Sequence, residues 1–234
     1  MRFASCAYGA NYMSIMGVLG ASDGMADDAA ALCKRMGLSP ECIIHAKWES
    51  EGFATPAWLL IADPDTKNVI LVFRGTNSNS DWLTDLRCAH VAVEEAHQYI
   101  EGAGKDEPLA MHSGIWNTAV RCDTRCYDHV AQALAEREGW GLILTGHSLG
   151  AGVATLLGLR WKSRGAFPWL KVFAFAAPPV TSSLALVKQM EPYCTAIENS
   201  DDFVSRWCCG TCVDVCFAAY ALASVDGVVD DITR

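Results

Sequence analysis

Residues 141–150 read Gly-Leu-Ile-Leu-Thr-Gly-His-Ser-Leu-Gly, an apolar run that leads into a Gly-x-Ser-x-Gly motif. The apolar run is typical of a buried strand, and the residues that follow, 151–164, have the composition of a helix. A serine at the apex of such a strand-to-helix turn is tightly constrained, because a side chain at Gly146 or Gly150 would clash with neighbouring backbone. We therefore predict that Ser148 is a nucleophile, against the alternative of an ordinary glycine-rich β–α turn.

Length and composition favour one α/β domain spanning residues 1–234. The chain has 234 residues, of which 51% are hydrophobic, so it is long enough to bury a large core. A net charge of −9 argues against nucleic acid as a partner and against electrostatic adhesion to anionic lipid, so any lipid contact is expected to be hydrophobic. The longest apolar stretch, 215–223, is far shorter than the roughly 18 to 20 residues that span a bilayer.

The cysteine content indicates whether the protein is intracellular or secreted. Eleven cysteines is a high and odd number, whereas a secreted disulfide framework would normally pair them all. Polar residues at Asn11, Tyr12 and Ser14 also interrupt the N-terminal apolar stretch, which disfavours a cleaved signal peptide. We expect an intracellular protein, either cytoplasmic or peripherally associated with a membrane, rather than a secreted one.

Strand patterns alternate with helix patterns along the chain, which predicts a mostly parallel sheet with helices on both faces. Strands are expected at 42–48, 57–62, 69–73, 87–93, 141–144, 171–175 and 194–198, and helices at 3–19, 114–138, 151–164 and 182–190. One further helix is expected to have Asp23 as its N-cap and to end just before Gly37. The strand 69–73 is continuously apolar and is expected to be central, joined to 57–62 by a hairpin turn at 63–68.

Several further motifs share the order and spacing of one family. They are Val72-Phe73-Arg74-Gly75-Thr76, Asp81-Trp82-Leu83-Thr84-Asp85-Leu86, Met111-His112-Ser113-Gly114, the motif around Ser148, and Asn199-Ser200-Asp201-Asp202-Phe203-Val204. Together they resemble the class 3 lipases over roughly 69–206. The segment 2–16, with Ala7-Tyr8-Gly9, is similar to the helix that opens the catalytic domain of the sn-1-specific diacylglycerol lipases. The resemblance implies an α/β-hydrolase fold that cleaves acyl esters of di- or triacylglycerol at a lipid interface, without a metal or organic cofactor.

The resemblance also implies roles for particular residues. Asp202 corresponds to the acid of a Ser-His-Asp triad, although Asp201 is a neighbour that would serve as well, and a plain turn or cap is the alternative for this acidic cluster. The backbone amide of Leu149 and the residue Thr76 correspond to the two oxyanion donors. Thr76 has the alternative reading of a cap for the helix that follows it.

A lid is the other feature that the resemblance implies. Residues 80–86 match the short helix that covers the site in this family, with Trp82 on its apolar side. Such a helix would expose an apolar surface at a lipid interface, but Trp82 fits a core or groove position equally well.

The expected general base is missing from the pattern. All six histidines precede Asp202, at His45, His90, His97, His112, His129 and His147, whereas the fold orders its triad as Ser, Asp, His. Three explanations stay open: a C-terminally truncated chain whose histidine lies beyond Arg234, a catalytically inactive lipase-like binding protein, or another group acting as base. His147 is expected to be a structural neighbour of the nucleophile. A soluble carboxylesterase is the alternative enzyme.

Four thiols fall within nine positions at Cys208, Cys209, Cys212 and Cys216. The spacing lacks a second Cys-x-x-Cys pair and a nearby histidine, which disfavours zinc. Reversible acylation beside the apolar run at 217–220 is an alternative. We expect ordinary buried thiols here, and packing or surface thiols at Cys122 and Cys126.

Overall fold

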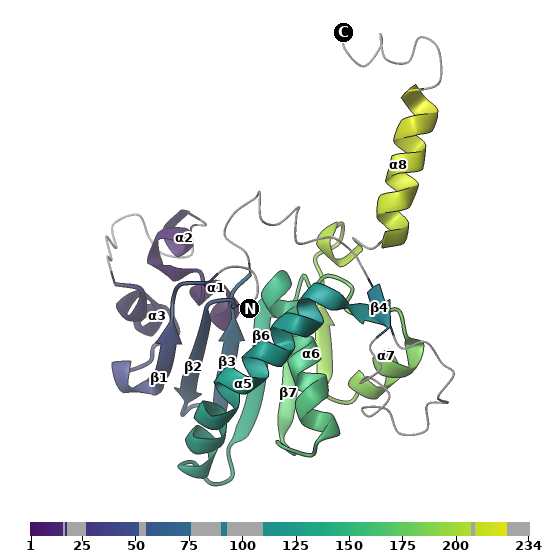
Figure 1. Ribbon diagram of the computed structural model, residues 1–234. Helices are drawn as coiled ribbons and strands as arrows, with labels where there is room; N and C mark the ends of the chain where they lie inside the picture. The colour runs from purple at the N-terminus through teal and green to yellow at the C-terminus, as the bar shows by residue number, and fades with distance from the viewer. Residues whose placement is uncertain are drawn as a thin grey trace.

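A six-stranded sheet forms the centre of the molecule (Figure 1). The computed structural model describes residues 1–15, 17, 27–51, 55–75, 90–92, 110–206 and 209–223, with the backbone alone at 90–92, 209, 210, 212 and 223. The strands are β1 (Ile43–Lys47), β2 (Trp58–Asp63), β3 (Asn68–Phe73), β6 (Gly141–His147), β7 (Leu170–Phe175) and β8 (Cys194–Ile197), with β4 (His90–Ala92) and β5 (Ala110–His112) in a separate pair. The helices are α1 (Arg2–Cys6), α2 (Gly9–Ile15), α3 (Asp28–Met36), α5 (Ser113–Ala135), α6 (Leu149–Ser163), α7 (Leu184–Met190) and α8 (Cys209–Ala223), with 3₁₀ turns η1 (Pro40–Cys42) and η3 (Val204–Arg206).

The sheet order, β1-β2-β3-β6-β7-β8, confirms the predicted mostly parallel arrangement. The pairs β3–β6, β6–β7 and β7–β8 are parallel, and only β2 runs against the other strands. The predicted hairpin joins β2 to β3, and its turn is held by Asp63, whose carboxylate accepts a 2.7 Å hydrogen bond from Thr66 Oγ1. The apolar strand β3 is central, as predicted, because it pairs with β2 on one side and β6 on the other.

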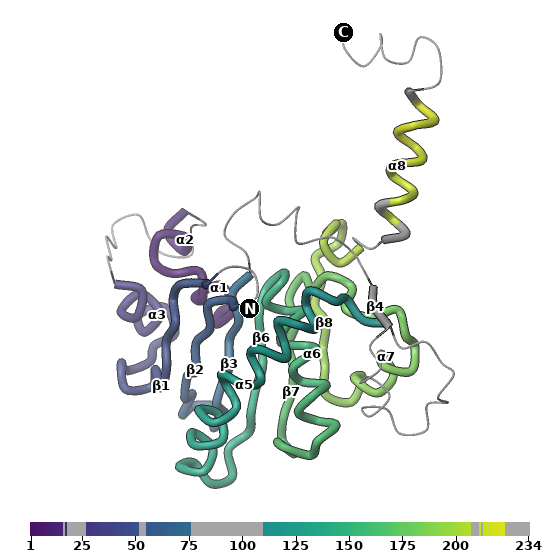
Figure 2. Tube along the Cα trace, in the orientation of Figure 1, coloured from purple at the N-terminus to yellow at the C-terminus, as the bar shows by residue number. Residues whose placement is uncertain are grey.

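Helices cover both faces of the sheet, as the alternating pattern predicts. One face carries α5 and α6, which bury alternate residues such as Leu142 and Leu144 of β6. The other face carries α1, α2 and α3, packed on residues such as Ile70 and Val72 of β3. Figure 2 shows α7 beside β8, at the far edge from β1. Each face therefore has its own apolar core.

Two predictions near the N-terminus need correction. The single helix expected at 3–19 is two short helices, because Gly9 adopts φ +83° between them. The N-cap of α3 is Asp27 rather than Asp23: Asp27 is extended and its carboxylate accepts a 3.0 Å hydrogen bond from Ala29 N. Asp23 itself lies outside the described residues, whereas Gly37 ends α3 in the left-handed region as expected.

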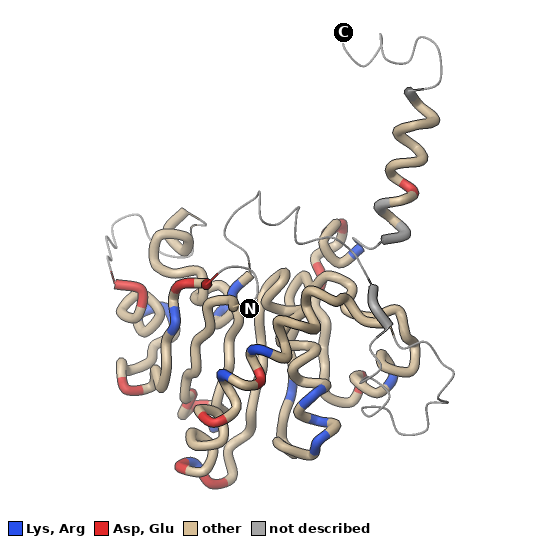
Figure 3. Tube along the Cα trace, in the orientation of Figure 1, with Lys and Arg blue, Asp and Glu red and all other residues tan. Residues whose placement is uncertain are grey.

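Helix α8 was not predicted, and it extends away from the sheet beyond the ends of the parallel strands (Figure 1). Its apolar side chains are between 50% and 75% exposed at Val213, Val215, Phe217, Tyr220 and Leu222. Asp214 is its one charged residue, which Figure 3 shows as a single acidic position. Across the described ranges, no helix combines the length and the hydropathy needed to cross a bilayer.

The described cysteine side chains differ in burial, and only some are buried as predicted. Cys122 and Cys126 lie on the buried face of α5 and pack in the core, and burial raises the pKa of the Cys122 thiol to about 12. The expectation of buried thiols near the C-terminus is wrong for Cys216, which is exposed on α8. The reason is that the body of the domain does not cover α8.

Asp123 ties α5 to the end of α6. Its buried carboxylate accepts hydrogen bonds from Trp161 Nε1 at 2.6 Å, Arg164 Nη2 at 2.8 Å and Arg160 Nη2 at 3.0 Å. Burial raises the pKa of the carboxyl, but the hydrogen bonds from Arg164, Trp161 and Arg160 outweigh it, so the net pKa lies below the ordinary value of 3.8. The charged form is therefore the one that the fold stabilises.

We expect Asp123→Ala to lower the free energy of unfolding at pH 7 by about 2 to 4 kcal/mol, because it leaves Trp161 and Arg160 without this acceptor. A carboxyl with a lowered folded-state pKa stabilises the fold fully above its unfolded pKa, and this stabilisation is lost as the pH falls through the folded-state pKa. Urea titrations should therefore show the difference from wild type shrinking below about pH 4. Asp128→Ala, at an exposed position of the same helix, is the matched control and should change stability by less than about 0.5 kcal/mol. Equal effects of the two variants would contradict this account.

Candidate active site

Ser148 occupies the sharp turn between β6 and α6. Its backbone has φ 54° and ψ −126°, a combination that a residue with a side chain adopts only under strain. Its N–H donates a 2.9 Å hydrogen bond to the carbonyl of Phe175, at the end of the neighbouring strand β7. The side chain is only 7% exposed, and no hydrogen bond to its hydroxyl comes from the described residues. The hydroxyl is thus held at the end of the sheet with its oxygen available.

The glycines of the motif are required by close backbone contacts. A methyl group at Gly146 would stand 2.5 Å from the carbonyl oxygen of Gly150 and 2.7 Å from Ala151 N. A methyl group at Gly150 would run into the carbonyl of Phe73, at the end of β3. The turn therefore packs directly on the neighbouring strand, as the motif predicts.

Two backbone segments flank Ser148. Leu149 is the first residue of α6, so its N–H has no acceptor within the helix. On the β3 side lies Gly75, two residues past the strand, where an added methyl group would lie 3.4 Å from Ser148 Cβ. Thr76 comes next in the chain but lies outside the described residues, as do Trp82 and the lid predicted at 80–86.

Asp202 lies in the loop that follows β8, at the same edge of the sheet as Ser148. Its Oδ1 accepts a 2.9 Å hydrogen bond from Val204 N, which starts η3. Burial lowers the pKa of the His147 imidazole, and the negative charge of Asp202 partly offsets that lowering. Asp201 is exposed at the surface of this loop. The structure thus gives Asp202 both the capping contact and an electrostatic link to the site, and its triad role stays a prediction.

A tyrosine that sequence reasoning did not select also reaches this site. The hydroxyl of Tyr8 lies 2.9 Å from Nδ1 of His147, the last residue of β6. Burial lowers the pKa of His147, with Asp202 opposing that shift, so the ring is held towards its neutral form. Among the described residues no hydrogen bond joins His147 to Ser148, which agrees with a structural role for this histidine. The only sequence signal for Tyr8 was the likeness of Ala7-Tyr8-Gly9 to relatives.

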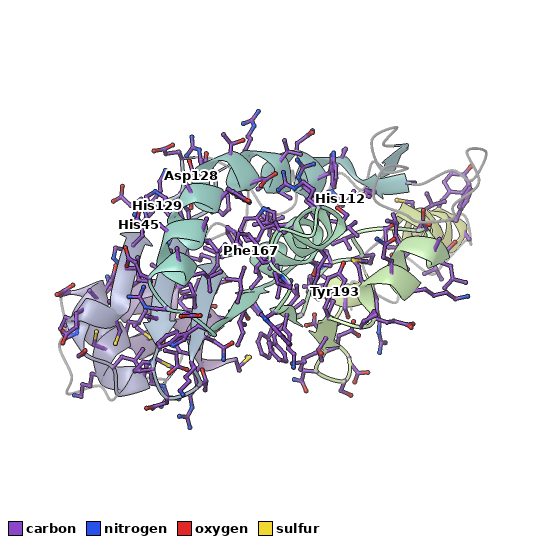
Figure 4. The ribbon with its side chains drawn as sticks, turned by 90° about the horizontal axis from the view of Figure 1, so that it is seen from below. His45, His112, Asp128, His129, Phe167 and Tyr193 are labelled. Carbon is purple, nitrogen blue, oxygen red and sulfur yellow. The ribbon has the colours of Figure 1, made fainter. Side chains whose placement is uncertain are left out.

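The other histidines with described side chains lie elsewhere. Figure 4 shows His45 and His129 side by side, and their rings are 4.7 Å apart next to Trp58. His112 is buried and caps α5 by accepting a hydrogen bond from Ile115 N, as expected for a packed histidine. His90 is described by its backbone alone, and His97 is outside the described residues.

The fold has counterparts in solved structures. A lipase from Rhizopus microsporus var. chinensis superposes with a TM-score of 0.64 at 18% identity, covering 87% of this chain and 65% of that one. Lipase II from Rhizopus niveus gives 0.64 at 20% identity, covering 87% and 70%. The fold is therefore that of an α/β-hydrolase, with Ser148 at the turn between β6 and α6. The family model described as Lipase (class 3) matches residues 70–210, and the chain belongs to that family.

Sequence relatives carry lipase names. Diacylglycerol lipase-beta of Mus musculus is 27% identical over 179 residues, which cover 76% of this chain and 25% of that protein. Putative lipase LIH1 of Saccharomyces cerevisiae is 32% identical over 150 residues, covering 61% of this chain and 44% of that protein. The chain thus spans a quarter to less than half of the length of these relatives.

Proposed function

We propose that this protein is a serine ester hydrolase of the lipase type that cleaves acyl esters of glycerolipids. The observation that carries the proposal is the strained backbone of Ser148 at the junction of β6 and α6. Membership of the class 3 lipase family supports the substrate class. The relatives named diacylglycerol lipase favour diacylglycerol over triacylglycerol.

In the proposed reaction, Ser148 Oγ attacks the carbonyl carbon of the ester and passes its proton to a histidine oriented by Asp202. This histidine is not one of the six in the sequence. The carbonyl oxygen becomes negative and is bound by the Leu149 amide and by Thr76. The glycerol oxygen then leaves with the proton from the histidine, and water hydrolyses the acyl-enzyme. No step requires a metal or an organic cofactor.

A second candidate function rests on one feature of the sequence. No histidine follows His147 in the sequence given, although the fold places its base after the acid. A lipase-like protein without a base would keep the strand-to-helix turn at Ser148 and lose turnover. The alternative is therefore a catalytically inactive protein that binds a lipid or a protein through the same site.

Peripheral contact with a lipid surface is part of the proposal. A protein of net charge −9 gains little from anionic lipid, so such contact depends on apolar side chains. The apolar side chains of α8 are exposed, and α8 begins a few residues after Asp202 at the substrate end of the sheet (Figure 1).

We place the protein inside the cell, in the cytoplasm or at a membrane, which the free thiols at Cys6, Cys33 and Cys122 support. We also propose that residues 1–234 form a single domain.

Reaction with a fluorophosphonate probe tests the proposed function. We expect a covalent adduct that peptide mapping locates at Ser148, and none at Ser183, which is a buried helix cap and serves as the internal control. A labelling rate that rises several-fold with diacylglycerol vesicles supports a lipase, whereas an unchanged rate indicates a soluble carboxylesterase. The same reaction is run on a version extended into any downstream reading frame. Labelling of the extended version alone supports the enzyme, whereas two folded versions that both stay unlabelled favour the binding protein.

A further inference from the structure

A cavity of about 280 Å³ lies between α7 and the edge strand β8. Its floor is the sheet, where Ala174 of β7 and Ala196 of β8 are register partners and present their methyl groups to the same face. Its opposite wall is α7, which lies beside β8 in Figure 2 and lines the cavity with Val187 and Met190. The two small side chains of the floor leave the space open beneath the helix.

The polar groups in the wall already have partners within the protein. Thr155 Oγ1 donates a 2.9 Å hydrogen bond to the carbonyl of Ala151, and Thr181 Oγ1 donates one of 2.7 Å to the carbonyl of Ala110. Pro178, another lining residue, has no N–H to donate. The wall therefore needs no hydrogen bond from its occupant, which suits a hydrocarbon chain.

The charged side chains that line the cavity are acidic. They are Glu198, just past the end of β8, and Glu191, just past the end of α7, and the described lining includes no lysine, arginine or histidine. These two charges repel an anion such as the carboxylate of a free fatty acid. The hydroxyl groups of an uncharged glyceride can instead donate hydrogen bonds to a carboxylate. The cavity therefore favours an uncharged lipid.

The volume matches one acyl chain. A methylene group takes up about as much space as a water molecule in the liquid, roughly 30 Å³, so 280 Å³ holds about nine such groups. The cavity follows β8, since Cys194 lines it at the start of the strand and Glu198 just past its end. A chain of about ten carbons fills this space, and a longer one extends out of it.

One end of the cavity lies beside the loop of the proposed catalytic acid. Ser205 lines the cavity, and its hydroxyl donates a 3.1 Å hydrogen bond to the carbonyl of Asp202. Ala177 also lines it, two residues past Phe175, whose carbonyl accepts the hydrogen bond from Ser148 N. A chain with its carbonyl end at Ser205 therefore lies next to the segments that hold Asp202 and Ser148.

We propose that this cavity binds one acyl chain of an uncharged glycerolipid, with the glycerol end towards Glu198 and Ser205 and the methyl end towards Met190. The choice of a glycerolipid rests on the proposed function, whereas the size and the charge of the cavity do not. Affinity should rise with chain length only until the chain fills the cavity, at about ten carbons.

Protection of the Cys194 thiol reports binding, because this free thiol lines the cavity. 1-Monoacylglycerols from butanoyl to dodecanoyl are added during alkylation with iodoacetamide, and mass spectrometry measures the rate at Cys194. The concentration that halves this rate should fall by about 2- to 4-fold for each added carbon and level off near decanoyl. Decanoate should require a concentration at least about 10-fold higher than 1-monodecanoylglycerol. Cys42, in η1 next to the opposite edge strand β1, is the internal control and should react at an unchanged rate.

Ala196→Phe and Thr195→Phe form a matched pair of variants on β8. Both positions are exposed, but alternation along the strand places Thr195 on the other face, away from the cavity. Each variant is compared with its own rate of alkylation without lipid. Half-protection of Cys194 by 1-monodecanoylglycerol should need a concentration about 10-fold higher in Ala196→Phe and within about two-fold of wild type in Thr195→Phe.

The outcomes separate this inference from the proposed function. An unprotected Cys194, equal protection of Cys42, affinity that keeps rising to dodecanoyl, or an Ala196→Phe variant that binds like wild type each overturns the inference. Protection of Cys194 while Ser148 stays unlabelled by the fluorophosphonate probe supports the inference and contradicts the proposed hydrolysis. Labelling of Ser148 without protection of Cys194 overturns the inference alone.

Discussion

In a chain that includes the triad histidine, Ser148→Ala is expected to lower kcat for glycerolipid ester hydrolysis by roughly 10⁴- to 10⁶-fold. The variant removes the atom that forms the acyl-enzyme, so only the oxyanion donors and substrate binding remain to assist water. KM should change little, because the hydroxyl contributes to the chemical step and not to holding the acyl chain. Initial rates of fatty acid release from diacylglycerol vesicles measure the loss. Alanine keeps a Cβ at the same strained backbone position, so the variant should unfold at nearly the same temperature as wild type.

The control for this variant is Ser183→Ala. Ser183 caps α7 through a 3.4 Å hydrogen bond from Leu186 N, so its loss should cost about 1 kcal/mol of stability and leave turnover intact. Hydrolysis that survives in Ser148→Ala would place the nucleophile at another residue and contradict the proposed function.

In the same histidine-containing chain, Asp202→Asn is expected to lower kcat by roughly 10⁴-fold at neutral pH. A triad carboxylate holds the imidazole in the tautomer that accepts the serine proton and stabilises the charged ring, and a neutral amide does neither. Asparagine retains an oxygen that can accept the hydrogen bond from Val204 N, so η3 should keep its start. The loss should therefore appear in kcat and not in thermal stability.

Asp201→Asn is the matched control, because Asp201 is adjacent in the chain and exposed. It should retain turnover within about two-fold of wild type. If Asp201→Asn loses activity and Asp202→Asn does not, the acid is Asp201. If neither variant changes turnover, the acidic cluster is only a turn and cap.

The sequence predicted best those features that depend only on residues close together in the chain. The alternation of apolar strands and helices predicted β2, β3, β6 and β7, and the glycine spacing around Ser148 predicted the elbow, because both depend on residues close together in the chain. The sequence predicted the N-cap of α3 at Asp23, whereas the structure has it at Asp27. The prediction failed because several aspartates in one segment satisfy the same capping rule.

The contacts that sequence reasoning missed are those that join distant segments. Tyr8 and His147 are 139 positions apart, and no local pattern links an N-terminal tyrosine to the end of β6. The exposure of α8 was missed because its apolar composition favours burial. Only the packed structure shows that the rest of the domain leaves this helix uncovered.

The parallel pairing of β3 with β6 bears on how the protein acquires its site. Asn68 pairs with Gly141 and Phe73 with Gly146, so the whole stretch 74–140 must close as a loop before Gly150 can meet the carbonyl of Phe73. Helix α5 in that stretch can form in microseconds, whereas such long-range pairing is slow. During refolding, helical signal should therefore return well before Ser148 becomes reactive, and chains caught between these two stages would have apolar strands exposed to aggregation.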